Sequence, residues 1–193
     1  MEKTSHYAVE IPEPRVSKFL FGDSRLGWIW FVARIYVGYQ WLSAGWEKVA
    51  GNGWIGTGAG GPLRGFLAGA IAQQGGPHPN VASWYAWFLA NVVAAHAGIF
   101  ANIVAFGEVA AGAGLILGAF TGIAAFAGAF MNLNYLFAGA VSTNPILLAI
   151  ELFLILAWRN AGWLGLDRWL LPWLGVPWKP GNAFDARSSA SPQ

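Results

Sequence analysis

Apolar residues gather into four long runs, and each run has about the length that crosses a bilayer. A spanning helix needs about 20 mostly apolar residues at a rise of about 1.5 Å per residue. The four runs cover residues 26–47, 98–118, 120–140 and 144–165. This pattern predicts an all-α, integral membrane protein with a bundle of four transmembrane helices. The Asn144-Pro145 pair is typical of a helix start.

The segments between these runs predict how the helices connect. Only a few residues separate the second run from the third, and the third from the fourth, so both pairs should form antiparallel hairpins. The first connection, residues 50–83, is long and rich in glycine, and "LRGFLAGAIAQQ" within it predicts a short surface helix. A loop of this length is usually functional. The following "WYAWFLANVVAAHA" either extends the second helix or lies along the membrane surface.

The two ends of the chain differ from the middle. We expect residues 1–25 to form a polar N-terminal segment, residues 26–166 to form the membrane domain, and residues 167–193 to form a tryptophan-rich interfacial segment with a disordered tail. Basic residues precede the first helix and follow the fourth, whereas the long loop carries only Arg64, with Lys48 at its rim. The positive-inside rule therefore places both termini in the cytoplasm, and this requires an even number of crossings.

Composition supports a membrane protein and excludes several chemistries. Of the 193 residues, 56% are hydrophobic and 10% are charged, against roughly 25% charged in soluble domains. The basic residues form no patch, so we expect no nucleic-acid partner. The chain has no cysteine, which excludes a disulfide, a thiolate nucleophile and an iron–sulfur cluster held by cysteines. No second histidine lies within a predicted span, so we expect no bis-histidine haem, and no flavin or metal site is evident.

Charged residues within the predicted spans are the candidate site. At about 100° per residue, Arg34 and Lys48 share one face of the first helix, together with Trp41 and two glycines that allow another helix to come close. An isolated ion at this depth costs about 2.5–3.5 kcal/mol on insertion scales, so the charges should pair inside the bundle. From their depths, we predict that Arg34 pairs with Glu108 beside Asn132, and that Lys48 pairs with Glu151 nearer the outer surface.

Two interpretations of this charged cluster stay open. The ion pairs either fix the register of the helices or line a ligand or proton site, because ionisable residues inside membranes usually mark such sites. His96, at the outer edge of the second helix, either binds a quinone head group or a metal, or is an interfacial residue. The glycines at 112, 114, 118 and 122 include two GxxxG spacings, which favour helix packing.

Three features resemble the DoxX/DoxD family. They are "GWEKVAGNGW" after an arginine-bearing first helix, "FGEVAAGAGLILGAFTGIAAFAGAFMN" in the central hairpin, and the four-helix plan with one long first loop. The resemblance implies a membrane subunit of thiosulfate:quinone oxidoreductase, which oxidises thiosulfate to tetrathionate and passes electrons to quinone in a bacterial or archaeal cell membrane. The positions that match the family pattern are Arg34, Trp46, Lys48, Glu108 and Asn132.

Two functions therefore stand as hypotheses. The first is a quinone-linked redox subunit, in which quinone binds at Trp41, Trp46, His96 and Asn132, and chemistry falls to Glu108, Lys48, Arg34 and Glu151. A desolvated carboxylate favours its neutral form and could relay protons. Because the chain has neither cysteine nor a fused soluble domain, thiosulfate oxidation would need partner subunits. The second is a non-catalytic accessory subunit, packed in the lipid against a larger bioenergetic or photosynthetic complex through its tryptophan-rich faces.

Overall fold

The computed structural model describes residues 13–176, and this part of the chain is 76% helix with no strand. The principal α-helices are α2 (Gly27–Ala50), α3 (Gly61–Ala72), α4 (Ser83–Phe88), α5 (Ala97–Leu117), α6 (Thr121–Phe137), α7 (Asn144–Leu156), α8 (Trp158–Gly162) and α9 (Asp167–Trp173). Short helical turns complete it: α1 (Arg15–Ser17), the 3-10 turns η2 (Ser24–Leu26) and η3 (Gly56–Gly58), and the π-helical turns η1 (Lys18–Gly22) and η4 (Leu89–Val93). The prediction of an all-α protein is confirmed.

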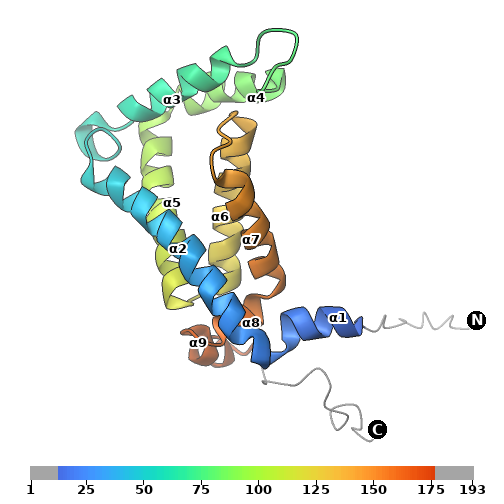
Figure 1. Ribbon diagram of the computed structural model, residues 1–193. Helices are drawn as coiled ribbons and strands as arrows, with labels where there is room; N and C mark the ends of the chain where they lie inside the picture. Colours follow the sequence, from blue (N-terminus) through green and yellow to red (C-terminus); the bar gives the residue numbers. More distant parts are fainter. Residues whose placement is uncertain (1–12, 177–193) are drawn as a thin grey trace, which may run out of the picture.

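Four long helices form the body of the molecule. In Figure 1, α2 crosses α5, and α6 lies beside α7. These helices match the four apolar runs, although the fourth run is divided, because α7 ends at Leu156 and α8 starts after a break at Ala157. Within the described part of the chain, α5 alone is both long and apolar enough to cross a membrane by length and composition. The helix α2 has 24 residues but is less apolar, α6 has 17, and α7 has 13.

Glycine determines how closely α2 approaches α5. A Cβ atom added to Gly45 would lie 2.6 Å from the Val109 amide nitrogen, and one added to Gly112 would lie 2.7 Å from the Leu42 Cα atom. Real Cβ atoms do not come this close to backbone, so any larger residue would push the helices apart. The predicted packing role of the small residues is confirmed for Gly38, Gly45 and Gly112. The two GxxxG spacings do not lie within one helix, because α5 ends at Leu117 and Gly118 adopts a left-handed conformation.

A helical layer covers one end of the bundle. The helices α3 and α4 lie across the upper end of α5 and α6 in Figure 1. They share a hydrophobic core with η4 that includes Leu67, Val81 and Leu89. The predicted surface helix in the long loop is therefore present. The segment after it, residues 83–93, does not extend α5 but turns away from it, so the alternative that it extends the second helix is wrong.

The opposite end carries the short helices near both ends of the chain. There α1 and η1 project from the lower end of the bundle, and α9 lies beneath it (Figure 1). The Asn160 side chain donates a 2.8 Å hydrogen bond to the Asp23 carbonyl and so joins the two segments. Trp169 and Trp173 of the predicted interfacial segment are exposed. Trp178, the whole of the predicted disordered tail and residues 1–12 lie outside the described residues.

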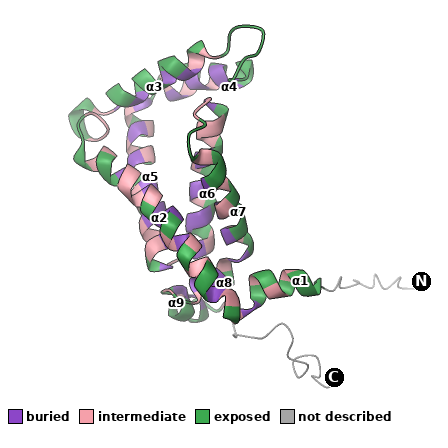
Figure 2. Ribbon diagram, viewed as in Figure 1, coloured by how far each residue is buried: buried purple, intermediate pink, exposed green. Residues whose placement is uncertain are grey.

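The bundle exposes many large apolar side chains and buries several charged ones within a mainly apolar core. Figure 2 shows exposed residues along the outer faces of the long helices and buried residues where they meet. Many exposed side chains are large and apolar, among them Ile99, Ile103 and Phe106 on α5 and Ile123, Phe126 and Phe130 on α6. The fully buried side chains include polar and charged ones, notably Arg34, Glu108, Asn132 and Glu151. The prediction that the charges face the interior of the bundle is confirmed.

Candidate functional site

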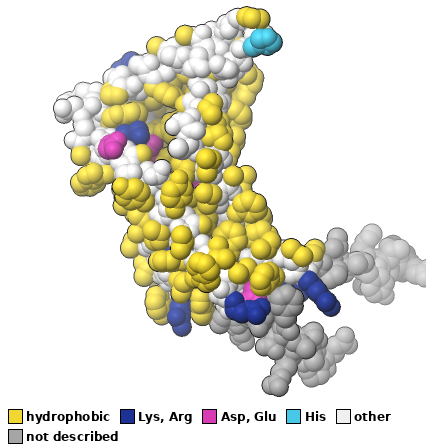
Figure 3. Space-filling view, in the orientation of Figure 1, with side chains coloured by type: hydrophobic (Ala, Val, Ile, Leu, Met, Phe, Trp, Pro, Cys, Tyr) yellow, Lys and Arg dark blue, Asp and Glu magenta, His cyan; other side chains and the backbone are white. Residues whose placement is uncertain are grey.

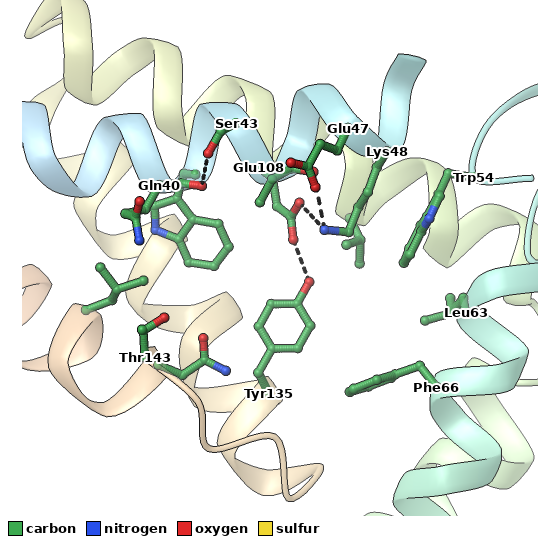
Figure 4. A pocket seen from close by; sticks show the side chains of 15 residues that line it. Gln40, Ser43, Glu47, Lys48, Trp54, Leu63, Phe66, Glu108, Tyr135 and Thr143 are labelled. Atoms are coloured by element: carbon green, nitrogen blue, oxygen red, sulfur yellow. Dashed lines mark hydrogen bonds and ion pairs between the residues drawn. The ribbon is translucent and has the colours of Figure 1, made fainter. Parts of the chain in front are cut away.

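A cavity of about 460 Å³ lies between the upper part of the bundle and the covering layer (Figure 4). The helices α2, α5, α6 and α7 supply most of its walls, and α3 closes one side. Its apolar surface includes Trp54, Leu63 and Phe66, and its polar surface includes Lys48 and Glu108. This volume falls within the range of small-molecule sites, about 300–1,000 Å³.

An ion pair and a phenol form the polar wall of the cavity. The Lys48 ammonium lies 2.7 Å from the Glu108 carboxylate, and the Tyr135 hydroxyl donates a 2.6 Å hydrogen bond to the other oxygen of that carboxylate (Figure 4). Only 1% of the Glu108 side chain is exposed, whereas 19% of the Lys48 side chain is. The ammonium also lies 5.2 Å from the centre of the Trp54 ring. Lys48 is therefore the charged member of this group that a ligand can reach.

A second buried carboxylate lies behind Trp41. The Trp41 indole N–H donates a 2.5 Å hydrogen bond to one oxygen of Glu151, and the Asn132 amide donates a 2.6 Å hydrogen bond to the other. The Trp41 indole lines the cavity, and its plane lies within 21° of the Tyr135 ring at a centroid distance of 6.4 Å. The two aromatic rings therefore connect the two buried carboxylates.

Both predicted ion pairs are wrong in their partners. Lys48 pairs with Glu108 instead of Glu151, and Asn132 contacts Glu151 instead of an Arg34–Glu108 pair. The backbone of Lys48 lies near the upper end of α2, and its flexible side chain reaches Glu108 on the neighbouring α5. The Trp41 indole, two helical turns earlier on the same face of α2, occupies the donor position at Glu151.

Arg34 lies at the other end of the bundle. Its guanidinium donates hydrogen bonds to the carbonyl oxygens of Leu115, Ile116 (3.0 Å) and Leu164 (3.1 Å). The last carbonyls of a helix lack partners inside the helix and carry partial negative charge, so they can accept hydrogen bonds from a buried cation in place of a carboxylate. The prediction overlooked these backbone acceptors at the end of α5.

Asp167 forms the matching contact at the start of α6. Its carboxylate accepts hydrogen bonds from the amides of Phe120 (2.6 Å) and Thr121 (2.8 Å). The first amides of a helix are also unpaired, so a carboxylate at this position stabilises the helix start. Arg34 and Asp167 thus fasten the turn between α5 and α6, and neither lines the cavity.

Two other predicted site residues lie away from the cavity. The Trp46 side chain is 63% exposed on the outer face of α2. His96 is exposed just before α5, and its Nδ1 atom lies 3.0 Å from the Val92 carbonyl oxygen. Neither contributes to the polar wall, so the structure does not bring these two residues together with Lys48.

Sequence reasoning missed Tyr135, which completes the polar wall. A signal was present, because Tyr135 follows Asn132 by three positions and residues spaced in this way share a helix face. Phe66, from the long loop, packs edge-on against Tyr135 with centroids 6.0 Å apart. On α4, outside the bundle, the Tyr85 hydroxyl donates a 2.9 Å hydrogen bond to the Asn134 side chain, and burial raises the pKa of Tyr85 to about 12.

The chain was compared with known protein families, curated proteins and solved structures. None of the three comparisons finds a match. Within residues 13–176, no group of three or more His, Asp or Glu side chains is placed to hold a metal ion. The resemblance to the DoxX/DoxD family therefore stays a prediction, and the geometry of the cavity carries the functional argument.

Proposed function

We propose that this chain is a four-span membrane subunit of a quinone-linked redox complex, related to the DoxX/DoxD proteins. The observation that carries the proposal is the cavity in which the Lys48–Glu108–Tyr135 group faces aromatic walls. Thiosulfate is the reductant that the family resemblance suggests.

The distribution of apolar and charged side chains supports the membrane part of the proposal. Figure 3 shows a broad hydrophobic band on this face of the bundle, with most of the basic side chains near its lower end. Large exposed apolar patches on soluble monomers are rare, whereas lipid contact requires them. The helix α6, at about 25 Å, is shorter than the hydrocarbon core of about 30 Å. Local thinning of the bilayer and interfacial aromatic residues can accommodate such a mismatch.

The polar wall of the cavity supports the chemical part of the proposal. A quinone ring carries two carbonyl oxygens on a flat apolar body. The Lys48 ammonium has three donors, of which one contacts Glu108 at 2.7 Å and one lies 3.4 Å from the Ala44 carbonyl oxygen, so the third can bind a carbonyl oxygen of the ring. Trp41, Trp54, Phe66 and Tyr135 provide apolar and aromatic surface for the ring.

The same residues can deliver protons. Reduction of a quinone to a quinol takes up two electrons and two protons. Glu108 accepts from Tyr135 and pairs with Lys48, so it holds the ammonium in its protonated form. Lys48 gives a proton to the reduced ring and takes another from water at its partly exposed side chain, once for each of the two protons. The two electrons come from a partner subunit. The oxidation of two thiosulfate ions to one tetrathionate ion releases two electrons.

Quinone binding and reduction test this proposal. The protein is purified in mild detergent with its associated subunits, and decylubiquinone binding and thiosulfate-dependent decylubiquinone reduction are measured. We expect Lys48→Ala and Glu108→Gln to abolish reduction in protein that remains folded. Arg64→Ala is the matched control, because Arg64 is an exposed cation on α3 outside the cavity. Unchanged quinone binding and reduction in Lys48→Ala would contradict the proposed site.

The accessory-subunit hypothesis has one specific observation in its favour. Exposed tryptophans lie on helices at both ends of the bundle, and they include Trp84, Trp87, Trp169 and Trp173. Tryptophans of this kind anchor a protein at the membrane interface or pack against a neighbouring subunit. Copurification in fixed stoichiometry with a larger complex, together with no quinone binding by the chain, would favour this function over the first.

A further inference from the structure

Glu151 has no part in the proton chemistry proposed above, although it is buried within the same bundle. Its side chain lies outside the cavity lining and is fully buried. Both carboxylate oxygens accept hydrogen bonds from neutral donors, Trp41 and Asn132. Among residues 13–176, no lysine or arginine lies within ion-pair distance of this carboxylate. Burying a carboxylate without a cation beside it costs free energy, so its position calls for an explanation.

The surroundings of Glu151 fix one orientation of the Trp41 indole. Asn132 holds the carboxylate from α6, and Gly128 on the same helix leaves room for it. A Cβ atom on Gly128 would collide with the Glu151 carboxylate and would lie 2.7 Å from the Trp41 indole nitrogen. Three positions on α6 and α7 are thus arranged around a single indole N–H group.

The orientation of Trp41 determines the shape of the cavity. Its ring and that of Tyr135 both line the cavity, and their planes differ by 21°. Tyr135 is itself fixed by its hydrogen bond to Glu108. The two rings are therefore stacked nearly parallel, and the small part of Trp41 that reaches the cavity (4% of the residue is exposed) has a fixed position. A flat conjugated ring packs better than a puckered one against aromatic groups held in this way.

We infer that Glu151 is a positioning residue that fixes Trp41 as a wall of the cavity and thereby selects ligands with a flat ring. This inference rests on the proposed function, because it names a determinant of specificity for the same quinone site. Without its acceptor, the indole can rotate away from the plane of Tyr135. The cavity then loses its preference for flat rings and keeps the Lys48 contact to a carbonyl oxygen.

Two ligands that differ in ring shape test the inference. Duroquinone and 1,4-cyclohexanedione both carry two carbonyls at opposite ring positions, but the first ring is flat and the second is puckered. We expect Glu151→Leu to weaken duroquinone binding roughly threefold to tenfold relative to cyclohexanedione binding, which is the size of an aromatic contact. Glu151→Gln should restore the wild-type ratio, because its amide oxygen can accept from Trp41 while Asn132 turns its own oxygen toward the new amide.

Trp41→Phe provides a second test in case Glu151→Leu does not fold. It keeps a flat ring and removes the N–H donor. It should therefore lower the ratio of duroquinone affinity to cyclohexanedione affinity. Trp30→Phe is the matched control, since its indole also donates a hydrogen bond, 2.8 Å to the Leu20 carbonyl, at the other end of α2. An unchanged ratio in a folded Glu151→Leu or Trp41→Phe protein would overturn the inference and leave quinone binding intact. Failure of the wild-type protein to bind duroquinone would overturn the proposed function and the inference together.

Discussion

Lys48 and Glu108 form an ion pair of 2.7 Å between α2 and α5 at the wall of the cavity. The carboxylate is almost fully buried, and the ammonium is partly open to the cavity. Removing one partner of a buried pair leaves an uncompensated charge, which costs more than the pair contributes when both partners are present. The pair therefore links stability to the proposed function.

We predict strong coupling between these two residues in a double-mutant cycle. Lys48→Met and Glu108→Gln should each lower the unfolding free energy by about 3 kcal/mol, and the double variant should lose clearly less than the sum. Chemical denaturation in detergent micelles measures all four proteins. Tyr135→Phe is the comparison, since losing one neutral donor costs about 1 kcal/mol. Additive losses would show that the pair does not exist in solution.

The contact of Arg34 with backbone carbonyls gives a second prediction. Arg34→Met leaves the carbonyl groups of Leu115, Ile116 and Leu164 without this donor, and should cost about 2–3 kcal/mol of stability. Arg34→Lys keeps the charge but lacks the planar fork that reaches several acceptors, so it should recover only part of the loss. Unfolding of the three proteins in micelles gives the values. Full recovery by lysine would mean that the charge alone matters.

Asp167 gives a prediction about the start of α6. Asp167→Ala removes the acceptor for the amides of Phe120 and Thr121 and should cost about 1–2 kcal/mol. Asp167→Asn keeps one side-chain oxygen and should lose less. Hydrogen exchange followed at the individual amides is the measurement, and the amides of Phe120 and Thr121 should exchange faster in the alanine variant. Equal exchange in both variants and in the wild type would contradict the capping role.

The sequence predicts the helices and the burial of the charges, but not the pairing of those charges. Apolar runs of membrane-crossing length locate α2, α5 and α6 well, because a long helix leaves a strong periodic pattern. The sharing of one face by Arg34, Trp41 and Lys48 also follows from helix geometry and is confirmed by their burial or cavity contact.

Which partner each buried charged group finds depends on features that the positions of charged residues in the sequence do not show. An error of one turn in the relative depth of two helices moves a side chain by about 5 Å, which is more than an ion pair tolerates. Backbone carbonyls at a helix end and an indole N–H group also compete as partners, and they are the groups that contact Arg34 and Glu151. Tyr135 was missed because a tyrosine in an apolar run resembles an ordinary core residue.

The close contact of α2 with α5 gives a prediction with an internal control. Gly112→Ala places a Cβ atom 2.7 Å from the Leu42 Cα atom, so the helices must separate and the protein should lose about 1–3 kcal/mol of stability. Gly65→Ala, on α3, has nothing within 4 Å of the new Cβ atom and should be neutral or gain up to about 1 kcal/mol from helix propensity. Apparent melting temperatures in detergent compare the two. Equal effects would show that α2 and α5 are farther apart than described.

The four-span proposal makes a topology prediction that a single span through α5 does not share. The chain has no cysteine, so single-cysteine variants are clean probes for an impermeant thiol reagent. Four exposed positions serve: Val16 near the N-terminus, Gln74 after α3, Val141 between α6 and α7, and Leu174 after α9. Four spans place Gln74 and Val141 on one side of the membrane and Val16 and Leu174 on the other. A single span through α5 instead groups Val16 with Gln74 and Val141 with Leu174, so labelling of sealed vesicles in both orientations distinguishes the two topologies.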